Sequence, residues 1–169
     1  MSKRIFQAAS FTPTATADGS ALASATYMSL EAASATQILN VSEIQCCGQA
    51  TASAVNIMQF ARNLTAATTP TALAAPNGDG PLSGASAALA APPVTYVAAG
   101  AGPQRTNTAL TARLNLSFNA FGGIVKWFAN RGEEWQIIGT SVSVAPSSLS
   151  AFTGGNVGLM GAHIIYEPL

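Results

Sequence analysis

The chain has 169 residues, and only 8% of them are charged, whereas about 25% is usual for a soluble domain. Seven basic and seven acidic residues give a formal net charge of zero, so no broad basic field is present to bind a phosphate backbone, and we expect no direct contact with nucleic acid. A surface with so few charges predicts that other protein covers much of it, and the length suits one domain.

Residues 1–34 are rich in Ser, Thr and Ala, and they carry turn-forming pairs at Thr12-Pro13 and Asp18-Gly19. This composition predicts an extended N-terminal arm with room for one strand or short helix. The remaining residues, 35–169, are expected to form a single β domain.

Residues 38–47 favour a β-strand, but the spacing of their apolar positions shifts between Val41 and Ile44. Such a shift indicates a β-bulge or a strand covered on both faces. Residues 51–61 form a second β-prone run, and Gly48-Gln49 offers a turn between the two. We therefore expect a hairpin.

Residues 62–109 hold most of the nine prolines, together with many Ala, Thr and Gly residues. Proline removes ladder donors and glycine favours turns, so this Pro/Ala-rich segment predicts a long irregular loop with at most a short strand at 94–98. A short helix over 82–91 is the alternative, because alanine is the best helix former.

The clearest pattern spans residues 110–119, where apolar and polar residues alternate without exception and predict a half-buried strand. Residues 124–129 and 135–139 flank the turn Asn130-Arg131-Gly132-Glu133 and predict a second hairpin. A loop over 147–156 and a final strand over 157–166 complete the expected order.

Short strands separated by turns, without sustained helical periodicity, predict an all-β fold. We expect an antiparallel β-sandwich or a jelly-roll-like barrel, with the N-terminal arm and the long loop attached to it.

Three sets of residues are candidates for chemical sites, and each favours a structural role. Adjacent cysteines such as Cys46 and Cys47 make a strained disulfide, so two small buried hydrophobes are expected. His163 lies in a β-prone run without a recognisable nucleophile motif, and Glu133 and Glu134 lie in a turn. We therefore expect no enzyme activity, no catalytic residue, no cofactor and no metal site.

The aromatic residues Trp127, Phe128 and Trp135 lie close together across the second expected hairpin, beside Arg131 in its turn. Such residues can form a contact surface for a protein partner or a carbohydrate, or they can belong to the core or to a cross-strand pair. These four residues are the candidate partner contacts.

The second half resembles structural proteins of tailed-bacteriophage virions. The residues that carry the resemblance are 121–129, 132–139 and the closing run from Gly154-Gly155 to Tyr166-Glu167. The most similar class is the capsid decoration, or cement, proteins.

The resemblance implies a β-rich, non-enzymatic protein that binds the outer surface of a phage capsid and stabilises the shell. It implies the major capsid protein and further copies of this chain, as a homotrimer, as partners, and a location on the virion after synthesis in the host cytoplasm. No signal peptide or membrane span is expected. Residues 1–34 and 62–109 would then clamp neighbouring subunits.

Two other functions remain open. Another lattice-forming virion protein, such as a major coat, tail-tube or head-fibre protein, has the same compositional requirements. A glycan-binding module would use Trp127 and Trp135 as its binding surface.

Overall fold

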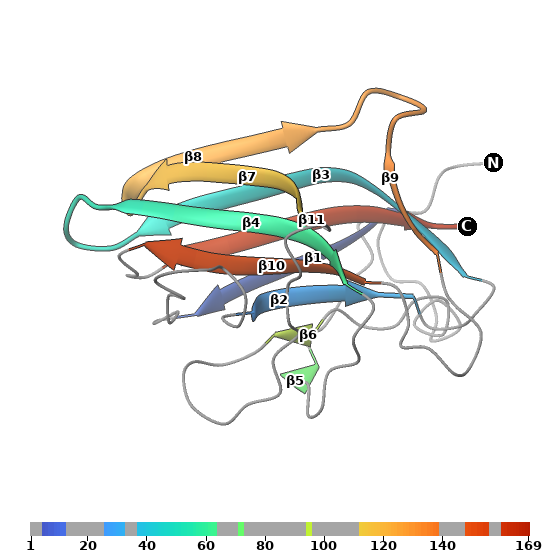
Figure 1. The fold of residues 1–169 in the computed structure, drawn as a ribbon, viewed down its shortest axis with the longest axis horizontal. Helices are drawn as coiled ribbons and strands as arrows, with labels where there is room; N and C mark the ends of the chain where they lie inside the picture. Colours follow the sequence, from blue (N-terminus) through green and yellow to red (C-terminus); the bar gives the residue numbers. More distant parts are fainter. Residues whose placement is uncertain are drawn as a thin grey trace.

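The structure of the protein is a computed structural model that describes residues 5–12, 26–32, 37–63, 71–72, 94–95, 112–138, 148–155 and 160–169. This part of the chain contains eleven strands and no helix, and every strand pairing is antiparallel (Figure 1). The prediction of an all-β fold with antiparallel sheets is confirmed for these residues. They include no helix long and apolar enough to cross a membrane.

The strands form two sheets, which we call sheet A and sheet B. Sheet A has the order β1 (Phe6–Thr12), β11 (Met160–Pro168), β3 (Ile38–Gln49) and β8 (Phe121–Phe128), and β9 (Trp135–Ile138) also pairs with β3. Sheet B has the order β5 (Thr71–Ala72), β6 (Val94–Thr95), β2 (Thr26–Glu31), β10 (Ser148–Gly155), β4 (Val55–Asn63) and β7 (Ala112–Asn119).

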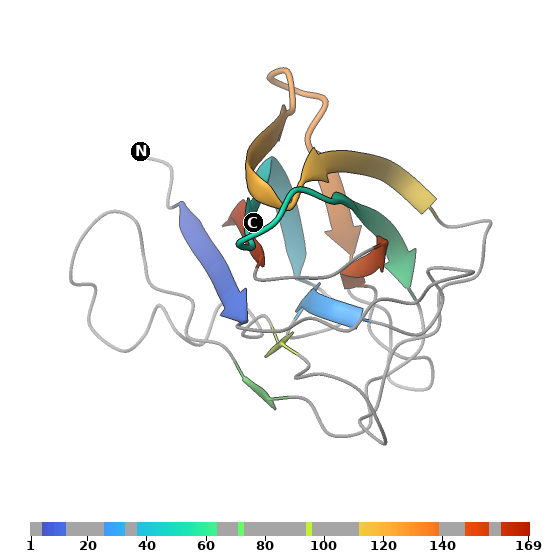
Figure 2. The ribbon, with the colours of Figure 1, turned by 90° about the vertical axis from the view of Figure 1, so that its left-hand side faces the viewer.

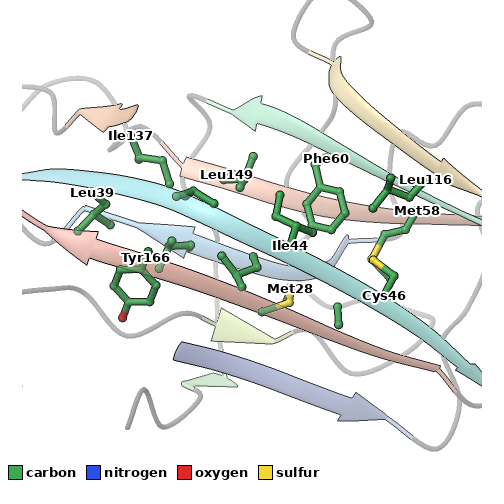
Figure 3. Close-up of a cluster of buried hydrophobic side chains, with 14 of the residues drawn as sticks. Met28, Leu39, Ile44, Cys46, Met58, Phe60, Leu116, Ile137, Leu149 and Tyr166 are labelled. Carbon is green, nitrogen blue, oxygen red and sulfur yellow. The ribbon is translucent and has the colours of Figure 1, made fainter. Parts of the chain in front are cut away.

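Both sheets contribute buried side chains to one hydrophobic cluster (Figure 3). Sheet A supplies residues such as Ile44 and Tyr166, and sheet B supplies residues such as Met28 and Phe60, all of them at most 1% exposed. The Sγ of Cys46 on β3 lies 3.4 Å from the Sδ of Met58 on β4, so the two sheets touch at this point. Burial of these apolar side chains is the main force that holds the sheets together.

Strand β7 has the alternation that the sequence predicts. Leu116 and Phe118 are buried and Leu114 is half-buried, whereas the polar residues between them are exposed. The half-buried strand is therefore confirmed over Ala112–Asn119; residues 110–111 lie outside the described part of the chain.

The first expected hairpin is wrong, because β3 belongs to sheet A and β4 to sheet B. The chain crosses between the sheets at residues 50–54, and the β7–β8 connection makes a second crossing beside it at Ala120. Backbone hydrogen bonds from Ala50 N to Ala120 O and from Ala120 N to Ala54 O, both 2.8 Å long, join the two crossings. Figure 2 shows β7 and β8, in yellow and orange, spanning the top of the molecule from one sheet to the other.

The corner where these crossings meet requires close contact between backbones. A Cβ atom added at Gly48 would collide with the backbone oxygens of Asn119 and Ala120, and one added at Gly123 would meet the backbone of Asn119. The Asn119 side chain accepts a hydrogen bond from Phe121 N at 2.8 Å and donates one to Ser53 Oγ at 2.9 Å. Glycine at position 48 therefore lets the two sheets join.

The expected second hairpin is also wrong. Strands β8 and β9 follow one another along the same edge of β3, where β8 pairs with Glu43–Gln49 and β9 with Ile38–Val41. The β3 residue between these two paired segments is Ser42. Strand β3 has a β-bulge there, as the shift in apolar spacing between Val41 and Ile44 predicts. Ala129 N donates to Ser42 O at 2.9 Å, and the chain then makes a short excursion before β9.

The loop over 147–156 also differs from expectation. Within residues 1–34 the described residues form β1, which pairs with β11, and β2, which lies between β6 and β10; the rest of the expected arm lies outside the described residues. Strand β10 occupies most of the expected loop, and β11 matches the expected final strand.

The described residues of the long loop contain the end of β4 and two short strands. Strand β6 falls within the short strand expected at 94–98, and it pairs with both β2 and β5. The alternative helix at 82–91 lies outside the described residues.

Candidate functional site

Strand β8 presents large apolar side chains to solvent, and they are the most conspicuous surface feature of the described residues. Phe121 is 63% exposed, Ile124 is 66% exposed and Phe128 is 60% exposed. We call these three residues the β8 stripe. Single exposed hydrophobic residues are common on proteins, whereas three large ones on one strand are less usual.

The uncovered outer face of sheet A explains the exposure of Ile124 and Phe128. Phe121 lies beyond a shift in the register with β3, opposite the exposed Gln49. Side chains alternate between the faces of a strand, so Val125 and Trp127 pack against the core while Ile124, Lys126 and Phe128 point away from it. Both sets contain large apolar residues. The outward-pointing apolar residues therefore cannot pack in the core.

A single ion pair accompanies the stripe. The Lys126 ammonium lies 3.3 Å from Glu43 Oε1 on the neighbouring strand and 5.7 Å from the centre of the Phe128 ring. Both side chains are solvent-accessible, at 43% and 19%, and exposed pairs of this kind add only about 0–1 kcal/mol to stability. Their main effect is to leave this edge without an uncompensated charge.

His163 lies on the outer face of sheet A, opposite Gln45 of β3. Partial burial lowers the pKa of the imidazole below its ordinary value; Glu43 opposes this shift and Lys126 adds to it. Neutral imidazole is therefore favoured in the folded protein, which fits the structural role expected for His163.

The lowered pKa of His163 predicts a loss of stability in mild acid. The unfolded chain gains a proton as the pH falls through about 6.5, before the folded protein does, so this histidine has little effect on stability at neutral pH and lowers it as the pH falls below that value. Urea unfolding of the wild type and of His163→Gln should show a stability difference that changes in this direction. A difference that is independent of pH would contradict the prediction.

The two tryptophans pack against each other and against the core. Their ring centroids are 4.4 Å apart with an interplanar angle of 34°, and both rings are half-buried. The structural reading of Trp127 and Trp135 is thus supported, although they lie on successive strands of one edge and do not form a cross-strand pair.

Arg131 is exposed in the excursion between β8 and β9. The excursion is held by its own hydrogen bonds: Glu133 N to Asn130 O at 2.9 Å, Asn130 Nδ2 to Glu133 Oε2 at 2.7 Å and Gly132 N to Glu134 Oε2 at 2.8 Å. The two carboxylates therefore stabilise the turn. Of the four candidate partner contacts, Phe128 and Arg131 are exposed and the two tryptophans are half-buried.

The cysteines point to opposite sides of β3, as the strand geometry predicts. Cys46 is buried in the core, where burial raises the pKa of its thiol far above the usual range, and Cys47 is half-buried on the outer face. Burial also raises the pKa of the Tyr166 hydroxyl to about 12. Neither shift produces a reactive group, and the described residues contain no cluster of three His, Cys, Asp or Glu side chains that could hold a metal ion.

The outer face of sheet B differs from the β8 stripe. Gln59 Nε2 donates to Asn115 Oδ1 at 2.9 Å across the β4–β7 pair, and exposed polar residues continue along β7. Among the side chains described on β4 and β7, one large apolar residue, Val55, is exposed.

Sequence reasoning identified Phe128 but missed Phe121 and Ile124. Residues 124–128 are mostly apolar on both faces, so the alternation alone does not show which set points inward. The large apolar residues on both faces of this strand are the signal that could have indicated the stripe, because a strand with one face exposed to solvent needs only one apolar face.

No protein-family model, curated protein or solved structure matches the chain.

Proposed function

We propose that this protein is a non-enzymatic structural component of a virion that binds the outer surface of a phage capsid and stabilises it. The observation that carries the proposal is the β8 stripe, whose three large apolar side chains are each at least 60% exposed. A charged fraction of only 8% supports it, because such a surface is suited to contact with other protein more than to full solvation.

The stripe also suggests an orientation on the shell. The outer face of sheet A at β8 would meet the major capsid protein, and the polar outer face of sheet B would point to solvent. In this proposal the two sheets form a β-sandwich related to a jelly roll, and the resemblance adds further copies of the chain itself as partners. The clamping role of residues 1–34 and 62–109 stays a prediction.

The proposal is tested by mixing the purified protein with undecorated capsids and measuring the amount that sediments with the shells. We expect saturable binding and a higher temperature of shell disruption. Absence of binding would reject the proposal. Assembly of the protein alone into shells or tubes would instead identify a lattice-forming virion protein.

Replacement of Phe128 with serine is expected to weaken capsid binding by about 10- to 100-fold, because burying a large apolar side chain contributes about 1.5–3 kcal/mol. The matched control is Val55→Ser, which removes a 65% exposed apolar side chain from β4 of the other sheet. The control should bind as the wild type does. Equal losses in both variants would show that the β8 stripe is not the contact.

A further inference from the structure

We propose that β8 pairs in antiparallel fashion with β8 of a second copy of this chain, which would join two copies of sheet A across a two-fold axis. The inference rests on the geometry and charges of β8. It does not depend on the proposed capsid binding.

The outer edge of β8 is open in the described part of the chain. Strand β8 is the last strand of sheet A, and β3 is its ladder partner. Alternate residues of such a strand direct their backbone N–H and C=O groups away from the sheet, where an added strand can bond to them. Proteins usually protect such edges with short strands, prolines, charges or β-bulges. Strand β8 has eight residues, no proline and one charged side chain, and its irregularity lies towards one end, at Gly122-Gly123.

That one charge does not protect the edge effectively. Lys126 is paired with Glu43 of its own chain at 3.3 Å, so the edge can enter an interface without leaving a charge uncompensated. The formal net charge of the chain is zero, and two copies therefore meet without long-range repulsion. The charges favour a second copy over a strongly charged partner.

The residues of β8 complement themselves in one register. If Val125 lies opposite Val125 of the second copy, Ile124 lies opposite Lys126, and Phe128 reaches the bulged end of the strand at Gly122. A Cβ added at Gly122 would have no atom within 4 Å, so space is available there for the Phe128 ring, and aromatic residues often cover glycine across strands.

Shifting the two copies by two residues in either direction keeps the same side chains on the outer face, but both of these registers are less favourable. One places Lys126 opposite its own copy, which sets like charges directly across from each other. The other places Phe128 opposite Ala120, which is 1% exposed and lies in the corner between the sheets. The register centred on Val125 avoids both problems.

The test measures the mass of the full chain by sedimentation equilibrium over a wide range of concentration, without capsids. We expect a reversible equilibrium between monomer and dimer. A monomer at every concentration, including one that still binds capsids, would overturn the inference and leave the capsid proposal intact. A trimer, the state that the resemblance implies, would also overturn it.

A matched pair of variants tests the register. Ile124→Lys places a lysine opposite Lys126 of the second copy, whereas Ile124→Glu places a carboxylate there. Both lose the same apolar group, so we expect Ile124→Glu to dimerise at least about tenfold more tightly than Ile124→Lys, since like and unlike pairs across strands differ by about 1 kcal/mol each and the two-fold axis repeats the pair. Equal dimerisation of the two variants would overturn the proposed pairing.

Two further measurements complete the experiment. Val55→Lys introduces the same charge at a 65% exposed position of sheet B and should dimerise as the wild type does. Amide hydrogen exchange in β8 of the unmodified chain should slow as the concentration rises, because pairing protects the outward N–H groups. Exchange that does not change with concentration would count against the pairing.

Discussion

Replacement of Phe60 with alanine is expected to lower the free energy of unfolding by about 3–5 kcal/mol. Phe60 lies on β4, is 0% exposed and belongs to the hydrophobic cluster to which both sheets contribute (Figure 3). The substitution leaves a cavity between the sheets that the surrounding side chains fill only in part. Since domains are typically stable by about 5–15 kcal/mol, this is a large share of the total.

Urea unfolding followed by tryptophan fluorescence measures the effect, because Trp127 and Trp135 pack against the cluster. The matched control is Phe121→Ala, which removes the same group from a side chain that is 63% exposed. That variant should change the free energy of unfolding by less than about 0.5 kcal/mol. A similar loss in both variants would mean that the cluster is not the core of the fold.

Replacement of Gly48 with alanine is expected to cost about 3 kcal/mol, at the upper end of the usual range for overpacking. The new methyl group would collide with the backbone oxygens of Asn119 and Ala120, and backbone cannot move aside as a flexible side chain can. The hydrogen bonds that Ala50 and Ala54 form with Ala120 would be displaced as well. The prediction is measured by the same urea unfolding.

Gly132→Ala is the control for this substitution. Gly132 has a φ of +89°, and a Cβ added there would have no atom within 4 Å. Alanine at this position therefore encounters backbone strain but no collision, and the expected cost is about 1–2 kcal/mol. A greater loss at Gly132 than at Gly48 would contradict the close packing of the corner.

The sequence allowed those parts of the fold to be predicted that depend on local pattern. The alternation in β7 and the bulge in β3 are properties of single strands, and both are found where the spacing of apolar residues indicates. The two hairpins failed because spacing does not reveal the partner of a strand. The five residues 50–54 are compatible with a return in the same sheet, but contacts with Ala120, far along the chain, take β4 into the other sheet.

Strand β10 was missed for a related reason. Its residues are mostly small and polar, and they have a low intrinsic preference for strands. It forms because β2 and β4 lie on either side of it and because Leu149 is 3% exposed in the core. Tertiary context, which is not written in the segment itself, decides its structure.

The aromatic residues of β8 stand out in the sequence, so Trp127 and Phe128 are both candidate contacts there. Which of them faces the core depends on how β8 pairs with β3. The exposure of Ile124 follows only from that pairing.

The position of β11 has a consequence for the order in which the protein folds. Strand β11 lies between β1 and β3, and its partners in β1 are about 150 residues away along the chain, for example Phe6 opposite Tyr166. Contacts between such distant residues slow folding. During synthesis the edges of β1 and β3 that pair with β11 stay unpaired until β11 leaves the ribosome. A chaperone that shields exposed strand edges should therefore raise the yield of folded protein.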